Sequence, residues 1–161
     1  MTKQEYTLEE ISYSRKEDRR ILEAVLKSWF KDPKSLNFVS PSVPFPFKFK
    51  KWLAGSYQID LDSITTLVLK KDNWIVGHIS MRLKEKKGHL FHLFIDKAHR
   101  KKGLAQNLVK TLEDHGKEKD ANTFSLFVVP KNEAAKKLYE KMGYQETDRS
   151  NNGSIKLEKL V

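Results

Sequence analysis

The chain has 161 residues, of which 31 are Lys or Arg and 21 are Asp or Glu, so its formal net charge at pH 7 is +10. This length allows one domain over residues 1–161 with its own hydrophobic core, and a composition of 39% hydrophobic and 32% charged residues excludes the disordered and fibrous classes. The absence of cysteine excludes disulfides, iron–sulfur clusters, thiolate zinc sites and a cysteine nucleophile.

Localisation and partners follow from the same composition. No apolar run approaches the roughly 20 residues that a membrane-spanning helix needs. The N-terminal sequence MTKQEYTLEE lacks the basic start and apolar centre of a signal peptide, so we expect a cytoplasmic protein without a membrane partner. The excess of positive charge favours polyanions, a class that includes nucleic acid, anionic membrane surfaces and phosphorylated cofactors.

The first predicted elements are a short strand over residues 11–13 and an amphipathic helix over 15–30. Hydrophobic residues recur at helical spacing through this helix. Ser14 and Glu17, three residues apart, match a capping box, which predicts the start of the helix.

Residues 31–53 differ from the rest of the chain because four of the five prolines fall among five aromatic residues there. Prolines at this density break helices and central strands, so we expect a structured loop with one short helix near 47–54, ended by Gly55. A long aromatic loop is either a lid over a site or a flap that seals the core.

From residue 63 the pattern becomes β-like and then alternates strands with helices. Strands are predicted over 64–69, 74–83, 89–95 and 123–129, helices over 104–116 and 133–142, and a terminal hairpin over 144–148 and 155–160. Strand, helix and strand over 89–129 form a βαβ unit, which requires two parallel neighbours, whereas the hairpins require antiparallel strands. The sequence therefore predicts an α/β (α+β) fold with a mixed sheet flanked by helices.

The most informative segment runs over 92–106, where a strand leads through a basic loop into a helix with Gly103 and Ala105 in its first turn. Free N–H groups, the positive end of the helix dipole and four basic residues would together bind a diphosphate. The alternative is an ordinary helix start preceded by a solvated basic loop. The glycine patterns of a P-loop and of a dinucleotide-binding turn are both missing.

Two motifs resemble those of the GNAT superfamily of N-acetyltransferases. RKKGLA, at residues 100–105, matches the signature Q/R-x-x-G-x-G/A after a strand. NEAAKKLY, at residues 132–139, followed by MGY, resembles the family's second motif. The resemblance covers roughly residues 62–148 and implies a mostly antiparallel central sheet with one splayed parallel strand pair.

The resemblance also implies where acetyl-CoA, the cosubstrate, would lie. Its arm would pair with the first parallel strand in a gap that opens after Ile95 and at Val129 and Pro130. Its diphosphate would contact the N–H groups of residues 101–106. The residues expected to bind acetyl-CoA are Leu93, Phe94, Ile95, Arg100, Lys101, Lys102, Gly103, Leu104, Ala105, Gln106 and Asn132.

Two catalytic residues are expected. Tyr139 matches the family's usual acid, which would protonate the leaving thiolate, although it could simply pack in the core. An alkylamine is only about one part in 10³ neutral at pH 7, so a base must remove its proton. His92 stands where relatives often have an acidic residue, and strand alternation places it on one face with Leu90 and Phe94. Its alternatives are a hydrogen-bonded structural histidine and a water-mediated route without a side-chain base.

The resulting interpretation is an acetyl-CoA-dependent N-acetyltransferase that acts on a primary amine, either a small molecule or a protein N-terminus, by direct transfer in a ternary complex. The aromatic residues Phe45, Phe47, Trp52 and Tyr57 are expected to wall the acceptor cleft. Two alternatives are a CoA-binding sensor without turnover and, less favoured, a nucleic-acid-binding module using the Lys- and aromatic-rich stretch 47–52. The scattered histidines predict no metal site, and the terminal strand 155–160 is a candidate edge for homodimer formation.

Overall fold

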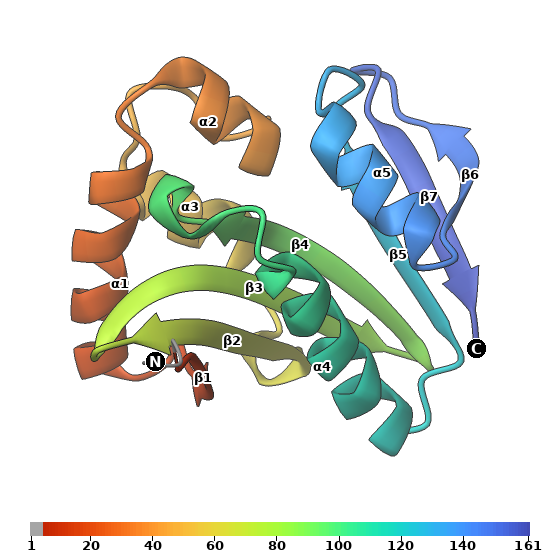
Figure 1. The fold of residues 1–161 in the computed structure, drawn as a ribbon, viewed down its shortest axis with the longest axis horizontal. Helices are drawn as coiled ribbons and strands as arrows, with labels where there is room; N and C mark the ends of the chain where they lie inside the picture. Colours follow the sequence, from red (N-terminus) through yellow and green to blue (C-terminus); the bar gives the residue numbers. More distant parts are fainter. Residues whose placement is uncertain (1–4) are drawn as a thin grey trace.

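The computed structural model describes residues 5–161 and contains one seven-stranded sheet with helices on both faces (Figure 1). Residues 1–4, which form part of the segment considered for a signal peptide, lie outside this range. The elements are, in chain order, β1 (Thr7–Ile11), α1 (Lys16–Trp29), α2 (Pro33–Val39), α3 (Phe49–Ser56), the short 3₁₀ turn η1 (Leu61–Ser63), β2 (Ile64–Lys71), β3 (Trp74–Lys84), β4 (Lys87–Ile95), the 3₁₀ turn η2 (Lys97–His99), α4 (Leu104–Glu118), β5 (Thr123–Val128), α5 (Glu133–Lys141), β6 (Gln145–Arg149) and β7 (Ile155–Leu160). No described helix has the length and apolar character needed to cross a membrane.

The strand order is β1-β2-β3-β4-β5-β7-β6, and every neighbouring pair is antiparallel except β4 and β5. The predicted fold class, a mixed sheet with one parallel pair, is therefore confirmed. The two parallel strands pair only at their beginnings, and the last paired residues are His89 and Ser125. The expectation that they separate after Ile95 is wrong, because β4 leaves its partner after His89, near the start of the strand. Figure 1 shows the divergence of β4 from β5.

Helices α4 and α5 cover one face of the sheet. Leu104, Leu108 and Leu112 point from α4 into a core that also contains Phe124 of β5. Gly116 does not end the helix, as the sequence suggested, but lies inside it. A Cβ atom on Gly116 would approach the Phe124 ring to 2.8 Å, so this glycine lets the helix pack closely on the sheet.

Helices α1, α2 and α3 contribute the second core, on the opposite face. Its central side chain is Trp52, which is fully buried. The segment 31–53 contains two helices rather than the single one expected, because Pro33 occupies the first turn of α2, where the missing N–H costs nothing. Asp32 caps this helix by accepting from the Ser35 N–H at 2.9 Å. The segment 31–53 thus helps to seal this core, and its residues 38–42 also line a cavity.

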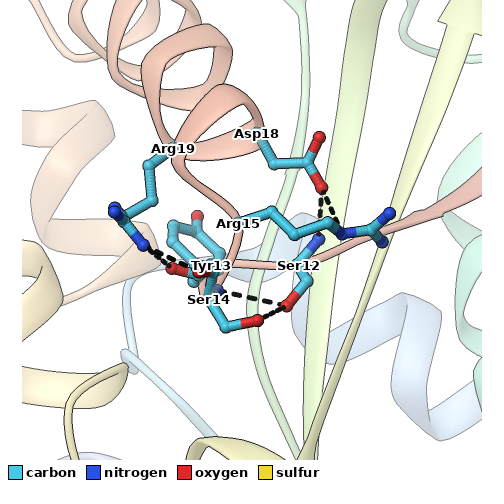
Figure 2. A network of polar contacts seen from close by, with 6 residues as sticks. All are labelled: Ser12, Tyr13, Ser14, Arg15, Asp18 and Arg19. Carbon is cyan, nitrogen blue, oxygen red and sulfur yellow. Dashed lines mark hydrogen bonds and ion pairs between the residues drawn. The ribbon is translucent and has the colours of Figure 1, made fainter.

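The start of α1 does not form the expected capping box. Arg15 is the N-cap, and within the described residues no side chain caps this end. Figure 2 shows the contacts that replace it: Asp18 accepts from the Ser12 N–H and pairs with Arg15, at 3.0 and 3.1 Å. Arg19 donates to the backbone carbonyls of Tyr13 and Ser14, each at 3.0 Å. The Ser14 hydroxyl bonds Ser12 instead of the helix.

The C-terminal hairpin has the predicted strands but a different position in the sheet. Strand β7 lies between β5 and β6 and pairs with both. It cannot offer an edge to a second copy, so the expected route to a homodimer through residues 155–160 is wrong. The edge on this side of the sheet is β6, whose residues are all exposed.

Candidate active site at the divergence of β4 and β5

A β-bulge at His92 determines which side chains of β4 face the site. His92 has a positive φ of 58°, and the pairing of β3 with β4 shifts register between His78 and Ser80. Leu90 therefore packs in the core under α4, whereas the His92 ring stacks on Trp52 in the opposite core, at 3.8 Å between ring centroids. The predicted alternation, which placed Leu90 and His92 on one face, is wrong because the bulge interrupts it.

Both ring nitrogens of His92 have defined partners. Nδ1 lies 2.8 Å from the Tyr57 hydroxyl, and Nε2 lies 3.1 Å from the Ser40 hydroxyl. Tyr57 in turn bonds Ser80 at 2.8 Å. Burial lowers the pKa of His92 well below its usual value, and nearby His78 and His89 lower it further. The imidazole is thus neutral near pH 7, with its orientation fixed on both sides.

His78 stabilises the bulge through a hydrogen bond to its backbone. Its Nδ1 donates to the His92 carbonyl at 2.7 Å, because a carbonyl oxygen can only accept. Its Nε2 must then accept from the Tyr13 hydroxyl at 2.8 Å, and that hydroxyl accepts from the Trp52 indole at 3.0 Å. Burial lowers the pKa of His78 to about 4. His78 does not line the cavity described below, and its role is to hold the bulge in place.

A cavity of about 290 Å³ lies beside His92, at the divergence of the two strands. Its walls come from residues 38–42, the end of α3, residues 89–92, the end of β5 and the turn before β7. None of the four aromatic residues expected to wall the acceptor cleft lines this cavity: Phe45, Phe47, Trp52 and Tyr57. Trp52 instead stacks on the His92 ring, and the Tyr57 hydroxyl forms a hydrogen bond with it.

The polar lining residues Ser40, Arg82 and His89 were among those not identified from the sequence. His89 Nδ1 lies 3.0 Å from the Ser125 hydroxyl. Burial lowers the pKa of His89 to about 4, and the positive charges of Lys156 and Arg82 contribute to this shift. Two histidines three residues apart on one predicted strand were the sequence signal for this pair. Only the bulge at His92 brings both side chains to the same cavity.

The turn before α4 has the geometry of a diphosphate site. Gly103 adopts the left-handed conformation with φ of 74°, and a Cβ atom there would meet no heavy atom within 4 Å. Within residues 5–161 no side chain caps α4, and its helical hydrogen bonds begin with the Asn107 N–H donating to Gly103 at 3.2 Å. The N–H groups of Leu104, Ala105 and Gln106 therefore remain for a ligand.

The basic residues of this turn differ in what they contact. Arg100 Nε donates to the Ile95 carbonyl at 2.8 Å, and the guanidinium lies over the Phe94 ring. Arg100 thus joins the turn to the end of β4. Lys101 is exposed and has a positive φ of 65°. The Lys102 Nζ lies 3.4 Å from the hydroxyl of Tyr6, the residue that precedes β1. The turn fits an anionic group, because it combines free N–H groups, open space and cations.

The edge of β4 that faces β5 continues the same site. Beyond His89 this edge has no strand partner among the described residues, since the β5 register ends there. The segment containing Leu93, Phe94 and Ile95 lies in this unpaired part and leads directly into the turn. The sequence-predicted positions for the arm and for the diphosphate are therefore contiguous along one strand and its turn.

Asn132 and Tyr139 lie at the two ends of α5. Asn132 caps the helix by accepting from the Ala135 N–H at 3.3 Å, which occupies its Oδ1. Tyr139 is 5% exposed and packs edge-on against Tyr144. Burial raises the pKa of Tyr139, and the nearby Glu113 carboxylate raises it further. Among residues 5–161 no cluster of three potential metal ligands occurs.

The family model of the acetyltransferase (GNAT) family matches residues 14–144. The chain belongs to this family. The resemblance inferred from the two motifs is thereby confirmed, and the family's acyl donor is acetyl-CoA, the cosubstrate expected from the sequence.

Curated relatives match parts of the chain. Human N-acetyltransferase 8 is 35% identical over 68 residues, which are 42% of this chain and 30% of the relative. The uncharacterized N-acetyltransferase YdgE of Bacillus subtilis is 38% identical over 64 residues, 40% of this chain and 41% of the relative. The chain thus spans less than half the length of these two relatives.

Solved structures share the whole fold at low identity. The GNAT domain of S. lividans PAT superposes with a TM-score of 0.77 at 16% identity, covering 96% of this chain and 89% of that chain. The PaiA N-acetyltransferase from Thermoplasma acidophilum, solved with coenzyme A, gives a TM-score of 0.74 at 18% identity, covering 98% and 99%. At these identities the likeness shows the fold alone.

Proposed function

We propose that this GNAT protein transfers an acetyl group from acetyl-CoA to a primary amine in a ternary complex. One observation carries the proposal. The His92 cavity and the uncapped N-terminus of α4 lie at the two ends of one segment of β4, and the edge of this segment that faces β5 has no strand partner among the described residues. A ligand bound along that segment would have its diphosphate at the turn and its other end beside the cavity. The acceptor amine would enter the cavity.

The residues present fit acetyl-CoA. The N–H groups of residues 104–106 and the left-handed Gly103 would hold the diphosphate, with Lys101 as an exposed cation. The backbone edge of residues 93–95 that faces away from β3 would hold the arm, and Asn132 would add its amide nitrogen. Bound there, acetyl-CoA supplies an acetyl thioester, which a neutral amine can attack.

His92 is proposed to take the proton of the amine. Keeping an alkylamine neutral at pH 7 costs about 4–5 kcal/mol, so an oriented acceptor for its proton raises the rate. His92 is neutral because burial lowers its pKa, and therefore one ring nitrogen always accepts. The Ser40 hydroxyl, 3.1 Å from Nε2 and in the cavity wall, would connect the amine to the imidazole. A charged imidazolium is unfavourable here, so the proton would pass on from His92 to solvent.

Tyr139 is proposed to donate a proton to the leaving thiolate. Its raised pKa keeps the phenol protonated throughout the physiological range, as a donor requires. A direct transfer to the amine is also consistent with the composition, because the chain has no cysteine to carry an acetyl group. The nucleic-acid-binding alternative loses its stacking surface, since Trp52 and Phe49 are buried.

The test is a steady-state assay of CoA release with acetyl-CoA and a panel of primary amines. Thiol reagents report CoA cleanly, because the protein contributes no thiol of its own. We expect His92→Gln and Tyr139→Phe each to lower kcat by about 10²–10⁴-fold, while the matched control His115→Gln, on α4, leaves kcat unchanged. Loss of less than threefold in both variants would contradict these roles, and a protein that binds CoA but releases none with any amine would be a sensor.

A further inference from the structure

The cavity beside His92 carries positive charge and no carboxylate. Among its lining residues, all of which lie in the described part of the chain, Arg82 is the only one that is permanently charged. The two histidines in the wall are neutral near pH 7, because burial lowers their pKa. Asp60 and Asp62, which lie between α3 and β2, do not line the cavity. A polycationic acceptor would therefore be repelled by the positive charge of Arg82, which no carboxylate in the cavity wall neutralises.

Arg82 is held in a fixed position without being neutralised. Its Nη1 donates to the Ile59 carbonyl and its Nη2 donates to the Ser56 carbonyl, each at 2.9 Å. Neither partner is charged, and no carboxylate among residues 5–161 forms an ion pair with Arg82. A guanidinium has five N–H donors, so the two carbonyls orient the group and leave other donors for a ligand.

The remaining walls add apolar surface on the same cavity. Phe38, Phe91 and Phe127 line it together with the serine hydroxyls. A rigid guanidinium matches a carboxylate in charge and shape, and aromatic walls favour an apolar group. We propose that the acceptor amine also bears a carboxylate and an apolar side chain, as an apolar α-amino acid does, and that Arg82 binds its carboxylate. This inference rests on the proposed acetyl transfer and narrows its substrate class.

Matched acceptors test the inference by turnover. Phenylalanine and phenethylamine differ only in the carboxylate, so their ratio of kcat/KM reports the contact. We expect phenylalanine to be preferred by at least about tenfold, the effect of one good charged contact. Arg82→Met should bring the ratio to about one, chiefly by raising KM for phenylalanine, and Arg82→Lys should restore part of it. Arg20→Met removes the same charge from an exposed site on α1 and should leave the ratio unchanged.

A binding measurement separates this inference from the proposed function. We expect the CoA-bound wild-type protein to bind 3-phenylpropanoate at least about tenfold more tightly than 3-phenylpropanamide by calorimetry. This holds whether or not any amine is acetylated, and it needs no variant if Arg82→Met fails to fold. Equal binding of the two compounds, or a phenylalanine preference that survives in folded Arg82→Met, would overturn the role of Arg82. Absence of turnover with every amine would instead overturn the proposed function.

Discussion

Replacing Gly103 by alanine separates the stability of the α4 turn from its capacity to bind CoA. The turn requires φ of 74° at this position, and a non-glycine residue in that conformation costs about 1–2 kcal/mol. No heavy atom lies within 4 Å of the added Cβ, so no clash increases this cost. For a domain of this size we expect Tm to fall by about 2–4 °C for each kcal/mol.

The effect of Gly103→Ala on CoA binding should be larger, because the new methyl group enters the open space in which the diphosphate is proposed to lie. We expect the Kd for CoA to rise at least about tenfold, or about 1.4 kcal/mol, by calorimetry. Gly153→Ala is the matched control: Gly153 has φ of 88° and equally open surroundings, but it lies in the β6–β7 turn. Folded Gly103→Ala that binds CoA as tightly as Gly153→Ala would refute the diphosphate site.

Three predictions concern stability. Trp52→Ala should lower the free energy of unfolding by about 3–5 kcal/mol in urea titrations, since the indole is fully buried; a loss below 1 kcal/mol would contradict its central place in the core. Glu113→Gln should cost about 1–3 kcal/mol, because the carboxylate holds Tyr144 at 2.6 Å and Lys159 at 3.1 Å, and Lys159 would lose its ionic partner. The free energy of unfolding should fall as the pH drops from 6.5 toward 4, by on the order of 3 kcal/mol for His78 alone. The reason is that the pKa of His78 is about 4 in the folded protein, so the unfolded chain takes up the proton first. Unfolding curves that coincide at pH 7 and 4.5 would contradict this.

The regular elements from β2 onward could be predicted because their signals are local. Hydrophobic periodicity identified α4 and α5, and turn residues separated β2 from β3. The motif around Gly103 placed a strand, a turn and a helix start in the correct order. A glycine at position 103 could be predicted, because the turn requires the left-handed φ of 74°, which a residue without a side chain adopts at little cost.

The cavity could not be predicted because its residues come from separate parts of the chain and depend on one irregular residue. The bulge at His92 is stabilised by His78 and by a stack on Trp52, contacts that link positions far apart in sequence. Ser40 reaches His92 only because α2 forms, and α2 was missed because Pro33 was read as a helix breaker rather than as a first-turn residue.

The central claim is that CoA binds along the unpaired part of β4 and at the start of α4. The most direct test is a titration of isotopically labelled protein with CoA, followed through its backbone amide resonances. We predict saturable changes that are largest for the amides of residues 93–95 and 103–106, with a 1:1 endpoint. Changes that centre on another part of the sheet, or none at millimolar CoA, would contradict the account.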